Sequence, residues 1–220
     1  SIVALDTENS AEVYNSLGVN NSYRAVRCER IFNSRYIQES KDCVNVYFAF
    51  DCRNCENCFG ATNKRNGKYL WFNEQLSKDE WEKRFAEIDL GDYAVVEEQQ
   101  KKFDELLAAA VWPENFNDKS VDSIGEYLTD STNNKYVYTS TGGAKNNAWC
   151  IWAIGNSEEN VFCADATEAQ SNYYTAGATN CFKCYYSIFV SRSQNCDYCI
   201  DLYDSENCFA CVGLRHKKFC

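Results

Sequence analysis

Residues 43 to 61 read CVNVYFAFDCRNCENCFGA, and every third residue of this stretch is small or apolar. The residues between them include the charged side chains Asp51, Arg53 and Glu56. A row of residues without charged side chains, lying between rows that contain them, is most simply interpreted as a row that faces inward. A period of three fits neither an α-helix, at about 3.6 residues per turn, nor a flat strand, at about 2. The members of this row are Cys43, Val46, Ala49, Cys52, Cys55, Cys58 and Ala61.

The same frame of three extends well beyond this stretch. Thirteen of the fourteen cysteines lie in it, and Cys150 is the exception. We expect the inward row to run from Ala25 to Ala61 and again from Ala148 to Leu214, with Asn160 and Asn172 as its large polar members.

A longer period of twelve residues lies on top of the short one. Asn33, Asn45 and Asn57 are twelve apart, and so are Asn195 and Asn207. Self-similarity at a fixed period indicates a solenoid, in which each coil buries its inner side by stacking on its neighbours. A coil this narrow encloses little space, so small inward residues such as Cys, Ser, Ala and Val are expected. The sequence predicts a mainly β fold, a narrow β-solenoid with 12-residue coils.

This coil pattern resembles the narrow 12-residue β-solenoids of beetle antifreeze proteins, which also point Cys, Ser and Ala inward at every third residue. Their ice-binding Thr-x-Thr rows are missing here, since the only such triplet, Thr139 to Thr141, lies outside the periodic region. The resemblance implies a coil shape and does not imply ice binding.

The chain also carries a gapless internal copy at an offset of 150 residues. Residues 57–70 match residues 207–220, and the match extends back through Tyr36 with Tyr186 to Phe32 with Phe182. We therefore divide the chain into a lead-in (1–24), solenoid block 1 (25–70), a helical insert (71–128), a loop (129–146) and solenoid block 2 (147–220). Block 2 stops where the first copy continues, so we expect a fragment of a longer protein.

The insert has helical patterning. Ser77 to Glu80 reads as a capping box in front of an apolar face, and a second helix is expected from near Asp92 to Pro113. Residues 120–128 suggest a short third helix, and residues 129–146 read as a loop. Residues 71–128 hold 15 acidic and 6 basic side chains, which accounts for −9 of the net charge of −10. We expect no nucleic-acid partner, because a broad basic face is absent, and no apolar run is long enough for a membrane span.

The cysteines allow three interpretations: thiols that fill space, zinc ligands, or disulfides across or between coils. Four of them, at C-x2-C-x8-C-x2-C spacing, form a candidate zinc set. The same frame also accepts Ser34, Val46 and Ala49, which cannot ligate zinc in that role, so we favour packing thiols. The candidate metal ligands are Cys196, Cys199, Cys208 and Cys211.

Catalytic residue types are scarce. His216 is the sole histidine, and it lies in a terminal basic turn. No phosphate-binding glycine motif is present. We expect a non-enzymatic protein without catalytic residues and without a cofactor, unless the zinc interpretation holds.

Outward aromatic residues mark a candidate interaction surface. A stacked row on the outer wall would be too apolar to leave bare, so either another part of the chain or a partner covers it. The residues of this surface are Phe162, Tyr174, Tyr186 and Tyr198.

The stretch from Asn57 to Tyr69, running into residues 72–80, resembles a motif of uncharacterised cysteine-repeat proteins from large tailed phages and candidate-phylum bacteria. Ala61 and Leu70 depart from it, where cysteines are expected. The resemblance implies a phage context and no established activity. We therefore expect a structural protein of a virion that binds other structural proteins or copies of itself. The alternatives are a zinc-binding module that contacts nucleic acid or protein, and a cytoplasmic location.

Overall fold

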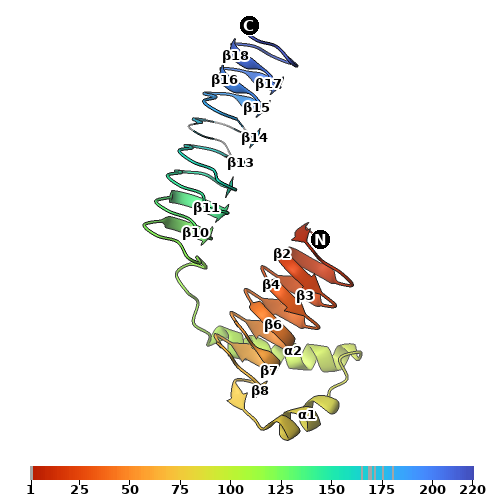
Figure 1. Ribbon diagram of the computed structural model, residues 1–220. Coiled ribbons are helices and arrows are strands. Elements are labelled where there is room, and N and C mark those ends of the chain that lie inside the picture. Colours follow the sequence, from red (N-terminus) through yellow and green to blue (C-terminus); the bar gives the residue numbers. More distant parts are fainter. Residues whose placement is uncertain (1, 165, 168–169, 171, 175, 180) are drawn as a thin grey trace. The chain divides into compact units, whose positions relative to one another are not determined.

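The computed structural model describes residues 2–164, 166–167, 170, 172–174, 176–179 and 181–220. Within these residues the chain is mainly β, with parallel strands and two helices. It divides into two compact units, Ser1–Trp112 (unit 1) and Pro113–Cys220 (unit 2). Figure 1 shows the strands of each unit following one another in regular succession.

Unit 1 pairs its strands in parallel at a constant register of twelve residues. Ile31 lies opposite Cys43, and Val46 lies opposite Cys58. Five strands close into a parallel barrel, because β2 and β6 are joined by two routes, one through β4 and the other through β3 and β5. A short antiparallel pair, β8 with β9, ends the sheet. The strands are β1 (Ile2–Leu5), β2 (Ala11–Asn20), β3 (Tyr23–Val26), β4 (Glu29–Phe32), β5 (Arg35–Gln38), β6 (Lys41–Phe50), β7 (Glu56–Thr62), β8 (Leu70–Trp71) and β9 (Glu74–Gln75).

The predicted inward row is confirmed for unit 1. Every third residue from Ala25 to Ala61 is buried, and the row extends back to Val13. The residues expected to form a lead-in therefore contribute β1, β2 and the start of β3 to the same sheet.

The backbone repeats with the same period of three. The residue before each inward residue has a positive φ along most of unit 1. Asn tolerates this left-handed conformation better than most residues, and many of these positions are Asn. Their side-chain amides also join successive repeats, since Asn33 donates to Asn45 at 2.7 Å and Asn45 donates to Asn57 at 2.9 Å.

Inward serines satisfy backbone groups that the sheet leaves free. The Ser34 hydroxyl donates to the Phe32 carbonyl at 2.9 Å and accepts from the Val46 N–H at 3.0 Å. Ser16 holds the N–H of Cys28 in the same way, at 2.9 Å. A buried N–H without a partner would cost free energy, so these positions select a hydroxyl as well as a small side chain.

Both predicted helices of the insert are confirmed. Helix α1 (Lys78–Ala86) begins at Ser77, whose side chain accepts from the Glu80 N–H. Helix α2 (Tyr93–Ala108) begins at Asp92, whose side chain accepts from the Ala94 N–H, and it ends before the expected stop at Pro113. Figure 1 shows α2 running beside β6 and β7, which it contacts. Neither described helix has the length and the apolar content that crossing a membrane requires.

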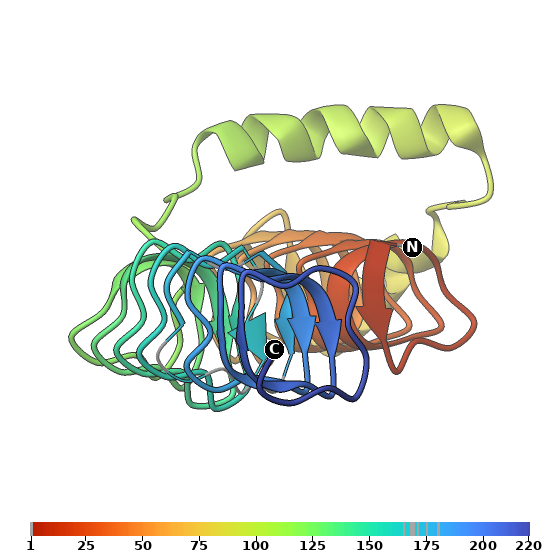
Figure 2. The same ribbon diagram turned by 90° about the horizontal axis from the view of Figure 1, so that it is seen from above.

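Unit 2 also consists of parallel strands, and here two predictions were wrong. Residues 124–128, expected as part of a third helix, form β10, and the expected loop contains β11. These segments pair with each other in parallel, so strand pairing outweighs their local turn and helix signals. Seen from above in Figure 2, successive repeats of unit 2 follow similar outlines. The strands are β10 (Ile124–Leu128), β11 (Lys135–Thr141), β12 (Ala153–Ile154), β13 (Ala166–Thr167), β14 (Ala178–Thr179), β15 (Ile188–Ser191), β16 (Gln194–Asp197), β17 (Ile200–Tyr203) and β18 (Glu206–Phe209).

Two repeats of unit 2 are thirteen residues long. Ser140 pairs with Ala153, and Ala153 pairs with Ala166, whereas later pairs such as Ile188 with Ile200 are twelve apart. In the first of the long repeats the extra residue lies beside Gly142 and Gly143, which have φ values of +77° and +88°. Each added residue shifts the inward frame by one position.

This shift corrects the expected row in the second half. The buried residues are Ala144, Asn147, Cys150 and Ala153, and the original frame resumes at Ser157. Ala148 and Ile151, which were expected to face inward, are not buried. Cys150 is therefore inward after all, and it differs from the expected frame because the second long repeat adds a residue between Ala153 and Ser157.

Candidate functional site

An exposed column of aromatic rings follows successive repeats of unit 2. Adjacent ring centroids lie 5.0 to 6.0 Å apart, and most neighbouring planes are within about 22° of parallel. All four residues of the predicted interaction surface belong to it, so the structure brings them together. The aromatic column consists of Tyr136, Trp149, Phe162, Tyr174, Tyr186 and Tyr198.

The aromatic column is held in an unfavourable backbone conformation. Its members have φ values between +51° and +62°. A bulky residue in this conformation costs about 1–2 kcal/mol, whereas Asn costs less. Ring stacking returns about 0.5–1.5 kcal/mol per pair. Asn occupies this backbone conformation at many other repeats, so the conformation does not require an aromatic side chain. The rings therefore contribute through stacking and through the surface that they present.

Further apolar side chains lie beside the aromatic column at the end of unit 2. Ile188 pairs in register with Ile200, and Ile200 pairs with Val212. The ring centroid of Phe209 lies 5.7 Å from that of Tyr198. All of them are exposed. Large apolar patches on a protein surface are usually contact sites, so this part of unit 2 is a candidate docking surface.

The corresponding surface of unit 1 is covered by its helices. Phe103 of α2 packs on Phe48, with centroids 6.1 Å apart, and Trp112 packs on Phe50 at 4.3 Å. Phe85 of α1 lies 4.8 Å from Tyr47. These contacts leave Phe48 and Phe50 fully buried on what would otherwise be an outer wall.

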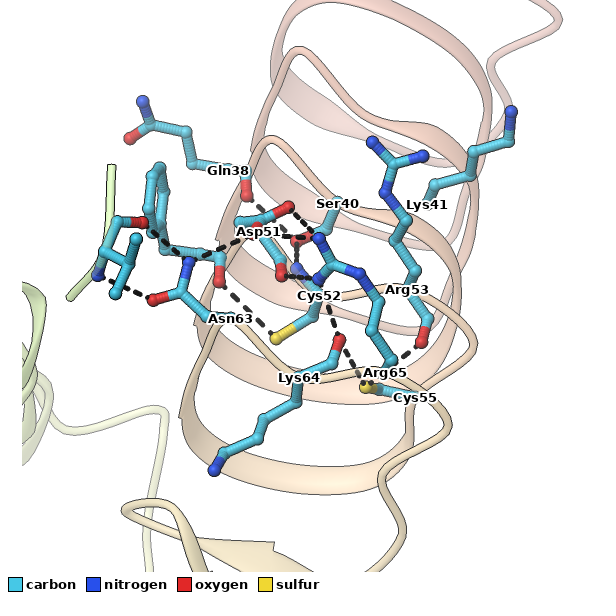
Figure 3. Close-up of polar contacts among 12 residues, drawn as sticks. Gln38, Ser40, Lys41, Asp51, Cys52, Arg53, Cys55, Asn63, Lys64 and Arg65 are labelled. Carbon is cyan, nitrogen blue, oxygen red and sulfur yellow. Dashed lines mark hydrogen bonds and ion pairs between the residues drawn. The ribbon is translucent and has the colours of Figure 1, made fainter. Parts of the chain in front are cut away.

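A polar cluster attaches the end of the helical segment to unit 1 (Figure 3). Asn63 pairs with Val111 through two hydrogen bonds, Nδ2 to the carbonyl at 2.8 Å and the Val111 N–H to Oδ1 at 2.9 Å. The Asn63 amide also donates to the buried carboxylate of Asp51 at 3.0 Å. Arg65 donates to the same carboxylate at 2.8 and 3.0 Å, so Asp51 is fully paired. The cluster therefore fixes where the chain leaves α2.

The buried thiols point at backbone carbonyls. Cys28 lies 3.3 Å from the Val26 oxygen and 3.5 Å from the Ile37 oxygen, and Cys43 makes two equivalent contacts. Burial raises the pKa of the Cys28 thiol to about 12. Contact with the Cys55 thiol, together with burial, raises the pKa of Cys43. Both effects keep these groups protonated and unreactive.

The four candidate zinc ligands lie in two neighbouring columns. Cys196 and Cys208 are partners in the register of β16 and β18, and their sulfur atoms contact backbone oxygens at 3.2 and 3.4 Å. Burial raises the pKa of Cys196 to about 11, which disfavours the thiolate that zinc requires. Among the described residues, no group of three or more His, Cys, Asp or Glu side chains is placed to hold a metal ion.

The disulfide interpretation applies to one pair. Cys150 and Cys163 are bonded between adjacent repeats, with their Cα atoms 4.6 Å apart. The other twelve cysteines are not in disulfides.

Sequence reasoning placed Asn160 and Asn172 in the inward row, and both are buried, but it did not identify Asn134 and Asn147 or the series of hydrogen bonds that these buried amides form. The Asn147 N–H donates to Asn134 Oδ1 at 2.9 Å, and the Asn160 N–H donates to Asn147 Oδ1 at 3.0 Å. In the next two repeats the Asn172 N–H donates to Asn160 Oδ1 at 3.2 Å, and the Cys184 N–H donates to Asn172 Oδ1 at 2.8 Å. These amides do what serine does in unit 1. The spacing of thirteen between Asn134, Asn147 and Asn160 is the signal that could have found them.

The sole histidine lies on the surface beside an acid. His216 Nδ1 is 3.3 Å from an Asp204 carboxylate oxygen, and both side chains are largely exposed. A His–Asp pair alone lacks the nucleophile that covalent catalysis needs. What unit 2 presents for contact is the exposed aromatic column and the apolar side chains beside it.

Comparison with known proteins adds little to this geometry. No protein-family model matches the chain, and no curated protein matches it. A solved structure of a candidate acetyltransferase from Desulfovibrio desulfuricans G20 is 9% identical, with 88% of this chain and 46% of that chain covered and a TM-score of 0.13. The chain spans less than half the length of that protein. A likeness this weak carries no argument about fold or activity.

Proposed function

We propose that this chain is a narrow β-solenoid that acts as a non-enzymatic structural scaffold in a phage virion. Parallel pairing at a register of twelve residues supports the solenoid, because each 12-residue coil would then stack on the next. The inward hydroxyls, thiols and amides fill and satisfy a very narrow interior. Such a solenoid would be stiff, since the described repeats within each unit are hydrogen-bonded to their neighbours.

The exposed aromatic column is the observation that carries the proposal. Its rings are stacked on a hydrogen-bonded framework, so they are already ordered before a partner arrives. Ordered aromatic surfaces lose little conformational entropy on binding, and aromatic residues are enriched at protein interfaces. A scaffold needs such a surface to hold the proteins around it.

The resemblance to cysteine-repeat proteins of large tailed phages supplies the context. It points to a virion location, with other structural proteins of the assembly, or further copies of this chain, as partners.

Quantitative mass spectrometry of purified virions tests the proposal. Peptides of this chain should appear in a fixed ratio to the major capsid protein across preparations. Recovery of the chain from the lysate, but not from the particles, would contradict a structural role.

A surface variant tests the role of the aromatic column in the same assay. Replacement of Tyr186 and Tyr198 by lysine should reduce incorporation into particles. A matched control is Tyr93→Lys, because Tyr93 is an exposed tyrosine on α2. Equal incorporation of both variants would show that the aromatic column does not hold the chain in the assembly.

A further inference from the structure

Three tyrosines of the aromatic column stack directly on one another in unit 2. The ring of Tyr186 lies between those of Tyr174 and Tyr198, with centroid distances of 6.0 and 5.0 Å and interplanar angles of 22° and 10°. In the repeats before Tyr174 the stacked neighbours are Trp149 and Phe162. Two phenol rings therefore first become neighbours in the column at Tyr174 and Tyr186.

The backbone holds these rings in register. The Tyr186 N–H donates to the Tyr173 carbonyl, and the Tyr198 N–H donates to the Tyr185 carbonyl, both at 2.9 Å. Each of these tyrosines is thereby tied to the repeat before it. The three stacked tyrosines also share nearly the same backbone conformation, with φ values of +62°, +51° and +55° along the series. The rings remain neighbours for as long as the strands stay paired.

The rings are open to small reagents in water. Tyr174 is 60% exposed and Tyr186 is 46% exposed. In unit 1 the helices do not cover this part of the column, because Arg24, 150 residues before Tyr174, has a side chain that is 55% exposed. Phe48, at the position equivalent to Tyr198, is buried under α2, so the argument for access uses Tyr174 and Tyr186 alone.

Neighbouring phenols can be joined by oxidation. A one-electron oxidant takes one electron from each ring, and each phenol releases its proton, which leaves two phenoxyl radicals. The ring carbons beside the oxygen-bearing carbon share the unpaired electron, so one such carbon from each ring forms a carbon–carbon bond. The hydrogen on each of these carbons then moves to the phenol oxygen, which restores both aromatic rings. With hydrogen peroxide as the terminal oxidant, two tyrosines and one peroxide give one dityrosine and two waters.

We propose that Tyr186 is a site of oxidative cross-linking, which hydrogen peroxide and a haem peroxidase couple to Tyr174 or to Tyr198 as dityrosine. The bond joins adjacent repeats through residues that lie twelve apart in sequence. Like a disulfide of the same span, it restricts the unfolded chain and so stabilises the folded unit. The inference does not depend on the proposed scaffold function, to which it adds a means of hardening the repeats.

Unit 1 provides an internal comparison. Tyr36, the counterpart of Tyr186, stacks at 4.8 Å on Phe48, which has no phenol oxygen. Its other neighbour, Tyr23, meets it edge to face at 87° and donates its hydroxyl to Glu12 at 2.7 Å. We therefore expect the cross-link in unit 2 and not in unit 1.

Peroxidase treatment of the purified chain tests the proposal. The chain is incubated at micromolar concentration with a haem peroxidase and hydrogen peroxide, and the monomer is isolated in urea. It is then reduced and alkylated, so that disulfides do not contribute to a loss of hydrogen. Trypsin cleaves after Lys183 and Arg192, which places the three stacked tyrosines on separate peptides.

Mass spectrometry and unfolding give the two readouts. Peptides that join Tyr186 to Tyr174 or to Tyr198 should appear, lighter by two hydrogen atoms than the separate peptides together. The treated monomer should also unfold at a higher urea concentration than the untreated one.

Matched variants separate the stacked site from other tyrosines. Tyr186→Phe removes the phenol oxygen and keeps the ring, and Phe48 and Phe162 show that the fold accepts phenylalanine at equivalent positions. This variant should lower the dityrosine yield of the monomer to about a tenth or less, because groups held side by side couple far faster than groups that must meet. Tyr93→Phe removes an exposed tyrosine on α2 and should leave the yield unchanged.

Three results would overturn the inference. The first is a treated native monomer without dityrosine in unit 2. The second is a yield that Tyr186→Phe leaves unchanged. The third is an equal yield from the chain unfolded in urea, with free tyrosine as the check that the peroxidase remains active there, since stacking would then play no part. Each can occur whether or not the chain is found in virions, so failure here is distinguishable from failure of the scaffold proposal.

Discussion

Arg65 donates from Nη2 to both carboxylate oxygens of Asp51, at 2.8 and 3.0 Å, and Asp51 is buried while Arg65 is about half exposed. The equivalent pair, Arg215 with Asp201, makes one such contact, from Nη2 to Oδ1 at 2.7 Å, and both of its side chains are exposed. The two pairs share their geometry and differ in burial, so they allow the effect of burial to be measured within one molecule.

Arg65→Ala should lower the free energy of unfolding of unit 1 by about 1–3 kcal/mol, because it leaves a buried carboxylate with fewer donors. Arg215→Ala removes the exposed pair and should cost about 0–1 kcal/mol. Urea denaturation of the two variants measures the difference. Equal losses would contradict the assigned burial of Asp51.

Ser34→Ala removes the hydroxyl that accepts from the Val46 N–H. We expect a loss of about 1–3 kcal/mol in the free energy of unfolding, since the N–H remains buried without a partner. Thr7→Ala is the control, because the Thr7 hydroxyl lies on the surface. A Ser34 variant as stable as the control would show that the N–H finds another acceptor.

Cys52→Leu should destabilise the chain by about 1–3 kcal/mol through overpacking, whereas Cys52→Ser should be tolerated better. The three repeats before Cys52 place small, buried residues in its column, namely Ser16, Cys28 and Ser40. Arg53→Leu adds the same side chain on the outer wall and serves as the control. Thermal unfolding compares the three, and a neutral Cys52→Leu would mean that the interior is wider than we describe.

Alkaline pH should destabilise the chain through its buried thiols. The pKa of Cys28 is raised by burial to about 12, from 9.0, so above pH 9.0 the folded state binds more protons than the unfolded state. The stabilising contribution is complete below pH 9.0 and is lost as pH rises toward about 12. Urea unfolding from about pH 8 to about pH 11 should show a falling free energy, with a smaller fall for Cys28→Ala. Identical slopes would argue that Cys28 ionises freely in the folded chain.

The period of three and the register of twelve could be predicted for unit 1 because both follow from local geometry. Each inward position is filled by a small or apolar residue, so the pattern is visible without knowledge of the partner strand. The helix starts at Ser77 and Asp92 were equally visible, since capping residues act on their own helix.

The pattern failed where one residue was added to a repeat. The frame shifts beside Gly142 and Gly143 and again between Ala153 and Ser157, and because of the second shift Ala148 and Ile151 were assigned inward and Cys150 was not. The strands β10 and β11 were missed because each is stabilised by a parallel partner in another repeat. Local propensity does not include that pairing. The covering of Phe48 by Phe103 likewise depends on residues far apart in sequence.

Metal and thiol content tests the central claim most directly, because the account has thiols filling a narrow interior. Native mass spectrometry of the chain, purified without chelator, should give the mass of the metal-free protein, and EDTA should leave its circular dichroism unchanged. Zinc at about one atom per four cysteines, lost together with the fold on chelation, would contradict the account.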